Sequence, residues 1–254
     1  MKPKNMFIII LISIFSIAIS IAVYTVISTG SYSKKTNNQF TFYYQTKEQF
    51  KIVNKIINQH IDKTASVFFP TESRNSKVKV YLKNKNEAKL DSILSQRSSI
   101  NGYYLNNKII LRTDRAIKEG PGGNQVIFAK PDAVKTFYHE YVHHLLLKTI
   151  NKELPRWFEE GLAEHFAHQI IGQPSEKIKP LGFEVITIDE NWTKYPSDEL
   201  YPSSEFYIKK IISRWGEKSI KETIISISEG DSFITALQKS TGQKYTTVIN
   251  ELSK

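Results

Sequence analysis

Hydrophobic positions divide the chain into a long apolar run, a mixed region and a mainly helical region. Residues 6–28 carry no charged side chain over 23 positions. A helix of that length is about 35 Å long, enough to cross a hydrocarbon core of about 30 Å. We therefore expect a transmembrane signal-anchor at 6–28. A cleaved signal peptide is the alternative, although its apolar core is usually shorter.

The flanks of this run predict how the chain would sit in a membrane. Residues 1–5 would be a cytoplasmic tail, and the polar residues 29–38 predict a short tether. The expected protein is then single-pass in the cell membrane, with the lipid bilayer as a partner through residues 6–28. Its remaining residues would be extracytoplasmic, or secreted if the signal were cleaved.

Residues 39–125 mix strand-like and helix-like spacing, which predicts a small α/β lobe. The expected elements are strands at 40–45 and 77–82, helical spacing over 50–61, a helix at 87–96 and a hairpin at 102–112. The hairpin should turn at Asn106 and Asn107, because asparagine tolerates the left-handed backbone that tight turns need.

Residues 126–254 are mainly helical and carry the candidate chemistry. Asp132 is a plausible N-cap for one helix, and Pro155 suits the first position of the next. Two further helices are expected at 203–215 and 217–228. The predicted fold class is therefore α+β, with an N-terminal transmembrane helix, a mixed sheet-and-helix lobe and a helical lobe.

Composition narrows the function classes. Lys and Arg number 35 against 25 Asp and Glu, so the net charge is +10. That charge suits attraction to an anionic envelope or lipid surface. Nucleic-acid binding is not expected, because no recognition motif or basic stripe accompanies the charge. The chain has no cysteine, so any metal must be held by histidine and carboxylate.

The segment His139-Glu140-Tyr141-Val142-His143 matches the H-E-x-x-H pattern. Positions i and i+4 share one helix face, so His139 and His143 can aim two imidazoles at one ion. Glu140 lies between them, close enough to hold a metal-bound water without being a ligand. His144 points about 100° away from His143 and is not expected to bind metal. The competing interpretation is a helix whose histidines are ordinary surface or core residues.

A second helix downstream offers carboxylates. Glu160 and Glu164 share one face, and 16 residues separate His143 from Glu160. A solvated face is the alternative, but beside H-E-x-x-H we favour metal ligation. Two neutral imidazoles, one carboxylate and one water would complete an open tetrahedral Zn²⁺ site. Gly161 costs this helix about 1 kcal/mol relative to alanine, which close approach of another helix would explain.

HEYVH followed by LPRWFEEGLAEHF resembles the gluzincin metallopeptidases, and most closely the small bacterial peptidase MA-like domains. GYYLNNKIILR and the helical tail are similar to theirs as well, so the likeness covers roughly residues 77–245. The resemblance implies a zincin-like fold in which His139, His143 and Glu160 bind one Zn²⁺ and Glu140 is the catalytic carboxylate.

The same resemblance implies two further roles. Glu164 would orient the first histidine ligand by a hydrogen bond, and it could alternatively replace Glu160 as the ligand. Tyr201 would donate a hydrogen bond to the oxyanion, with Tyr195 and Tyr207 as alternatives.

These observations predict a membrane-anchored zinc metallopeptidase that hydrolyses peptide bonds of a peptide or protein substrate by a Glu-assisted, zinc-bound water. By analogy, the hairpin around 105–111 could offer an edge strand to an extended peptide. The alternative is a catalytically silent zinc-fold envelope protein that acts in binding or assembly. Glu140 favours catalysis, because a pure binding module does not need it.

Overall fold

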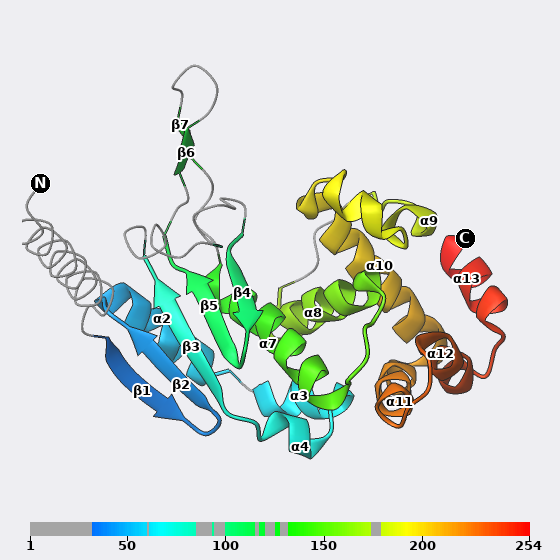
Figure 1. The fold of residues 1–254 in the computed structure, drawn as a ribbon, viewed down its shortest axis with the longest axis horizontal. Coiled ribbons are helices and arrows are strands. Elements are labelled where there is room, and N and C mark those ends of the chain that lie inside the picture. The colour runs from blue at the N-terminus through cyan, green and yellow to red at the C-terminus, as the bar shows by residue number, and fades with distance from the viewer. Residues whose placement is uncertain are drawn as a thin grey trace, which may run out of the picture.

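A computed structural model describes residues 32–59, 61–84, 93, 100–114, 117–119, 125–127, 132–173 and 179–254. Their architecture is α+β, as predicted, with a sheet beside a larger group of helices (Figure 1). Among these residues, no helix has the length and apolar character to cross a bilayer. The membrane helix expected at 6–28 lies outside them. We therefore correct the predicted fold class to α+β, since its transmembrane part is not supported.

A five-stranded mixed sheet forms one side of the fold. Its order is β1-β2-β3-β5-β4, built from β1 (Ser33–Asn37), β2 (Phe40–Tyr44), β3 (Val78–Lys83), β5 (Lys108–Arg112) and β4 (Gly102–Leu105). The three inner strands are parallel, and both edge strands are antiparallel to their neighbours. A separate ribbon pairs β6 (Ile117–Glu119) with β7 (Gln125–Ile127).

Two local expectations have opposite outcomes in this sheet. The β4–β5 hairpin is confirmed, with φ of 49° at Asn106 and 60° at Asn107. The tether expected at 29–38 is wrong in part, because Ser33–Asn37 pair with β2 as an edge strand. Pairing with a neighbouring strand satisfies this polar segment's backbone, and its composition alone does not reveal that.

Helices connect the inner strands and fill the C-terminal half. Between β2 and β3 lie α2 (Lys47–Ile57), α3 (Ile61–Phe68) and α4 (Thr71–Arg74). The later helices are α7 (Ala133–Thr149), α8 (Arg156–Ile171), α9 (Phe183–Ile186), the 3₁₀ turn η2 (Asp189–Thr193), α10 (Ser197–Trp215), α11 (Glu217–Ser228), α12 (Phe233–Thr241) and α13 (Tyr245–Ser253). The helix expected at 87–96 falls almost entirely outside the described residues.

Helix α7 lies between the sheet and α8 (Figure 1). The Asp132 carboxylate accepts hydrogen bonds from the backbone N–H groups of Val134 and Lys135, which confirms it as the N-cap. On the sheet side, the rings of Phe137 and Tyr141 pack against Phe40 at 5.3 and 5.0 Å between centroids. Burial on both sides fixes the axial position and rotation of the helix that carries the H-E-x-x-H segment.

Helices α8 and α10 approach unusually closely at Gly161. A Cβ atom added there would lie 2.5 Å from the backbone oxygen of Ser204, so the predicted reason for this glycine is confirmed. Helix α10 starts at Ser197 and passes through Pro202, whereas we expected a start at residue 203. Proline lacks a backbone N–H, so a helix that continues through it is not expected from sequence.

Replacing Gly161 with alanine should destabilise the protein. Alanine gains about 1 kcal/mol in helix propensity, but its methyl group would overlap the Ser204 carbonyl, and overpacking typically costs about 1–3 kcal/mol. We expect a lower midpoint in urea unfolding followed by circular dichroism. A midpoint that rises, as propensity alone predicts, would contradict the close packing of α8 on α10.

Candidate metal centre

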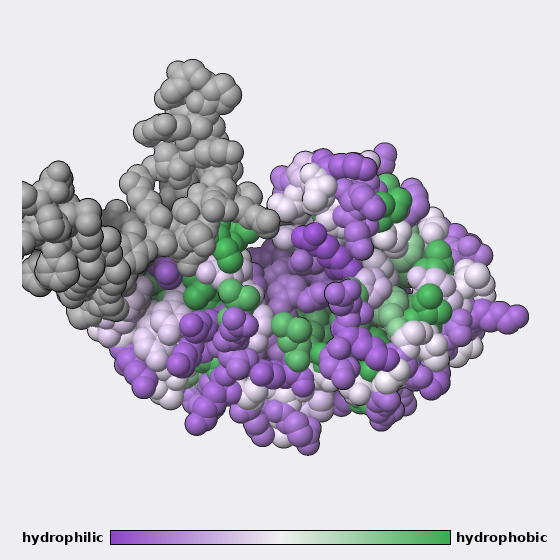
Figure 2. Space-filling view, viewed as in Figure 1, coloured by the Kyte–Doolittle hydropathy of each residue, from purple (hydrophilic) through white to green (hydrophobic). Residues whose placement is uncertain are grey.

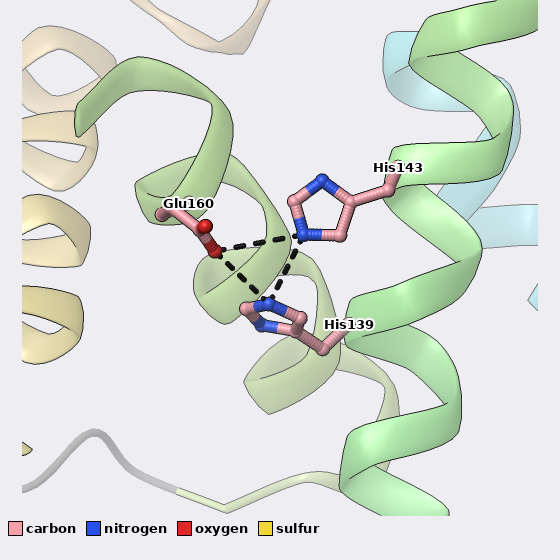
Figure 3. Close-up of side chains that lie close together, drawn as sticks. All are labelled: His139, His143 and Glu160. Atoms are coloured by element: carbon pink, nitrogen blue, oxygen red, sulfur yellow. Dashed lines mark hydrogen bonds and ion pairs between the residues drawn. The ribbon is translucent and has the colours of Figure 1, made fainter. Parts of the chain in front are cut away.

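Three side chains from α7 and α8 point at one another (Figure 3). His139 and His143 come from successive turns of α7, and Glu160 comes from the second turn of α8. Lys135, early in α7, pairs with Glu164, whereas the later His143 pairs with Glu159, so the two helices run antiparallel. The predicted ligands therefore meet across this helix pair, and they form a group that could hold a metal ion.

The three facing atoms form a nearly regular triangle. Glu160 Oε2 lies 3.1 Å from His139 Nε2 and 3.5 Å from His143 Nε2, and the two Nε2 atoms are 3.2 Å apart. Tetrahedral zinc with bonds of about 2.0–2.1 Å requires ligand atoms about 3.3–3.4 Å apart. The group therefore has the spacing of three corners of such a site and can hold a metal ion.

The outer nitrogen of each imidazole faces a carboxylate. His143 Nδ1 is 2.8 Å from Glu159 Oε1, and His139 Nδ1 is 3.0 Å from Glu164 Oε1, although the latter pair lies outside the angular range of a hydrogen bond. A neutral imidazole carries one N–H, and these carboxylates attract it to Nδ1. Each Nε2 then turns a lone pair toward the centre, where it can bind a cation.

Glu160 Oε2 is a third atom at the centre that favours a positively charged partner. The atom is buried and accepts no hydrogen bond from the described residues, although both Nε2 atoms lie near it. Two lone pairs and a carboxylate oxygen that face one another repel unless a proton or a metal lies among them. The donor set of two imidazoles and one carboxylate therefore fits a divalent ion.

When no metal is bound, the same charges determine which side chains of the centre are protonated. Burial acts to lower the pKa of His139, but Glu160 and Glu164 outweigh it and raise that pKa to about 9. For His143, burial likewise acts to lower the pKa, but Glu159 and Glu160 raise it well above the ordinary value. Although burial acts to raise the pKa of Glu160, the two imidazoles hold it far below its usual range. The centre thus attracts positive charge strongly.

Glu140 lies beside this group and is not part of it. The side chain is buried at the wall of the cleft, and the backbone N–H of Tyr104 in β4 donates a hydrogen bond to its carboxylate. Burial raises the pKa of Glu140 above its ordinary value, which makes the group a better proton acceptor. Glu140 therefore lies outside the set of candidate metal ligands.

Of the three candidate tyrosines, Tyr201 lies nearest the centre. Its ring centroid is 5.7 Å from that of His139, and it lines the same cleft. Burial, reinforced by the nearby Glu160, raises the pKa of Tyr201, so its hydroxyl keeps its proton. Tyr207 is buried and donates its hydroxyl to the Leu181 carbonyl at 2.9 Å, and Tyr195 is exposed outside the cleft lining.

Glu164 lies beside the outer nitrogen of His139. Its Oε1 faces His139 Nδ1 at 3.0 Å, and its Oε2 lies 2.7 Å from Lys135 Nζ. Although burial acts to raise the pKa of Glu164, His139 and then Lys135 lower it to about 2. Because it contacts the outer nitrogen, Glu164 is outside the ligand triangle, which Glu160 completes instead.

Sequence reasoning missed Glu159, Lys135 and the Tyr104 amide. Adjacent helical residues lie about 100° apart, so the Glu159–Glu160 doublet does not by itself indicate that both reach α7. Only the packing of α7 against α8 brings Glu159 to the second histidine. The adjacency of Glu159 and Glu160 in the sequence is the signal that could have suggested a role for both at the metal centre.

The remaining described histidines are buried and lie outside the group of His139, His143 and Glu160. His144 lies outside the group that could hold a metal ion, and its Nδ1 is 3.1 Å from the hydroxyl of Tyr104. His168 Nδ1 pairs at 3.0 Å with the buried Glu205, and His165 has no hydrogen-bond partner for either ring nitrogen among the described residues. His165 and His168 are both buried.

Two cavities meet at the centre. One, of about 850 Å³, extends along β4 and the first part of α7, and the other, of about 750 Å³, lies beside the last turns of α7. Their shared wall consists of His143, Leu147, Arg156, Glu159 and Glu160. A hydrophilic hollow is visible between the sheet and the α9–α10 side of the molecule (Figure 2). A ligand can therefore reach the centre from solvent.

Comparison with known proteins does not assign the chain to a family. No family model matches the chain, and no curated protein matches its sequence. The resemblance to gluzincins therefore rests on the residues described above.

We expect the purified protein to bind one zinc ion per chain. His143→Ala should lose that ion because one corner of the ligand triangle is gone, whereas the matched neighbour variant His144→Ala should retain it. Glu159→Gln should keep the stoichiometry but weaken affinity about 10- to 100-fold, the usual effect of removing a partner of a metal-bound histidine. Elemental analysis and chelator competition measure both. Unchanged zinc in His143→Ala would contradict the assignment.

The buried His165 predicts a loss of stability in mild acid. Burial lowers its pKa to about 4 in the folded protein, whereas in the unfolded chain it titrates near 6.5. As pH falls from 6.5 to 4 the unfolded state takes up the proton first, so up to about 3 kcal/mol of stability should be lost. Urea unfolding at several pH values should show a shallower loss for His165→Leu. Equal slopes would contradict a neutral buried imidazole.

Proposed function

We propose that this protein is a zinc-dependent peptide-bond hydrolase of the gluzincin type. The observation that carries the proposal is the spacing of three facing atoms, from His139, His143 and Glu160, with the buried Glu140 beside them and outside the ligand set. A structural zinc site normally has four protein ligands, whereas three leave a corner open for water or substrate.

Zinc is the ion that this donor set favours, since two imidazoles and one carboxylate with an open position are common in catalytic zinc sites. When bound, zinc polarises a water molecule and the substrate carbonyl, which makes hydrolysis possible at neutral pH. Glu159 and Glu164 would support the ligands, because each places a carboxylate oxygen next to the outer nitrogen of one imidazole.

Glu140 would move the proton. Its carboxylate accepts a proton from the attacking water as the new C–O bond forms, and it returns that proton to the amide nitrogen as the C–N bond breaks. The products are a carboxylic acid and an amine, and Glu140 is regenerated. Tyr201, which keeps its hydroxyl proton, would donate a hydrogen bond to the oxygen that becomes negative in the transition state.

The substrate would be an extended polypeptide. β4 is an outer strand of the five-stranded sheet, and its residues Gly102, Tyr103 and Tyr104 line the cleft. The outer strand of a sheet can bind an extended peptide through backbone hydrogen bonds regardless of sequence. Cavities on both sides of the centre leave room for substrate residues before and after the cleaved bond.

Glu140→Gln tests the proposal. The variant should keep zinc, because Glu140 is not a ligand, and should lose hydrolysis of a peptide library by at least about 100-fold, the effect of removing a general base. Full activity in this variant would refute the mechanism. No cleavage by the zinc-loaded wild type would instead support the catalytically silent alternative.

Tyr201→Phe should reduce kcat by about 100-fold with little change in KM, since its hydrogen bond would form only in the transition state. The matched control is Tyr195→Phe, an exposed tyrosine that is not among the residues lining the cleft. Steady-state kinetics on a cleaved peptide distinguish the two. Equal kcat values for Tyr201→Phe and wild type would remove Tyr201 from the mechanism.

A further inference from the structure

The cavity of about 750 Å³ beside the last turns of α7 has an apolar base. Leu146 and Ile150 are buried there, and Leu147 and Leu154 lie beside them. Its charged lining consists of Lys152, Arg156, Glu153 and Asp189, together with Glu159 and Glu160 at the wall shared with the centre. Because Glu159 and Glu160 face the imidazoles of the centre, the aliphatic side chains at the base are the main attraction that the cavity offers a ligand side chain.

Leu147 continues the face that carries the metal ligands. Residues 139, 143 and 147 are spaced i, i+4 and i+8, so the leucine lies one turn beyond His143. Its side chain is 63% exposed and lines both cavities. A single exposed leucine means little on a protein surface, but this one forms the boundary between the metal centre and an apolar cavity.

The direction of β4 indicates which part of a substrate reaches this cavity. Gly102 lies against Thr136, and further along β4 the Tyr104 hydroxyl lies 3.1 Å from His144 Nδ1. β4 and α7 therefore run in the same direction, and the cavity lies beyond the end of β4. A peptide added to β4 in the more stable antiparallel sense would direct its N-terminal residues toward Leu147.

We propose that this cavity binds an apolar side chain of the substrate residue on the N-terminal side of the cleaved bond, and that Leu147 is its specificity-determining residue. The inference rests on the proposed function, because it uses the metal centre and β4 to orient the peptide. It goes further by assigning a substrate class: polypeptides with a large aliphatic or aromatic residue before the cleaved bond.

N-acetyl amino-acid hydroxamates test this without requiring turnover. The hydroxamate group chelates zinc, and the side chain lies on its N-terminal side, where the substrate residue would be. With the zinc-loaded full chain, we expect the N-acetyl-leucine compound to bind at least about tenfold more tightly than the N-acetylglycine compound, as burial of a leucine side chain allows. Calorimetric titration measures both affinities.

Leu147→Lys should reduce that ratio to near one and favour the N-acetyl-aspartate compound, since a lysine in the last turn is compatible with the helix dipole. Ile234→Lys is the control, because Ile234 is similarly exposed, at 48%, on α12 away from the cleft lining. Equal binding of all hydroxamates to wild type, or an unchanged ratio in Leu147→Lys, would overturn the pocket assignment and leave the proposed function intact. A tenfold ratio without any peptide cleavage would support the pocket and refute the hydrolase.

Discussion

The structure depends on one electrostatic constraint: three acceptor atoms of His139, His143 and Glu160 face one another within 3.5 Å in a largely buried position. Carboxylates on the outer side of each imidazole leave the inner nitrogens as acceptors. Such an arrangement is costly without a positive charge at its centre and favourable with one. A bound divalent ion would convert the repulsion into attraction and link α7 to α8.

The rest of the fold holds these two helices in position. Aromatic side chains anchor α7 to the sheet, and Gly161 lets α8 pack directly against the backbone of α10. The same α10 brings Tyr201 to within 5.7 Å of the His139 ring, between centroids, while β4 supplies an amide to Glu140. Each group with a proposed chemical role therefore belongs to a helix or strand that is fixed by packing, which is how a site keeps its geometry before substrate binds.

Sequence spacing predicts the parts of this arrangement that one element determines alone. The i, i+4 pair of histidines, the cap at Asp132 and the Asn106–Asn107 turn each depend on local geometry, and all three agree with the structure. Gly161 belongs with them, because a glycine inside a helix signals a close neighbour even when that neighbour is unknown.

Other features depend on contacts between distant segments, which spacing does not encode. Glu159 reaches His143 only because α7 and α8 run antiparallel, and Ser33–Asn37 become a strand only because β2 offers its edge. The apolar run at 6–28 lies outside the described residues, among which no helix is long and apolar enough to cross a membrane.

Anomalous diffraction at the zinc edge, from crystals of the zinc-loaded protein, tests the central claim most directly. We predict one strong peak per chain about 2.0–2.1 Å from Nε2 of His139, Nε2 of His143 and a carboxylate oxygen of Glu160, with Glu140 outside bonding distance. A peak elsewhere, or a Glu160 side chain turned away from both imidazoles, would contradict the account.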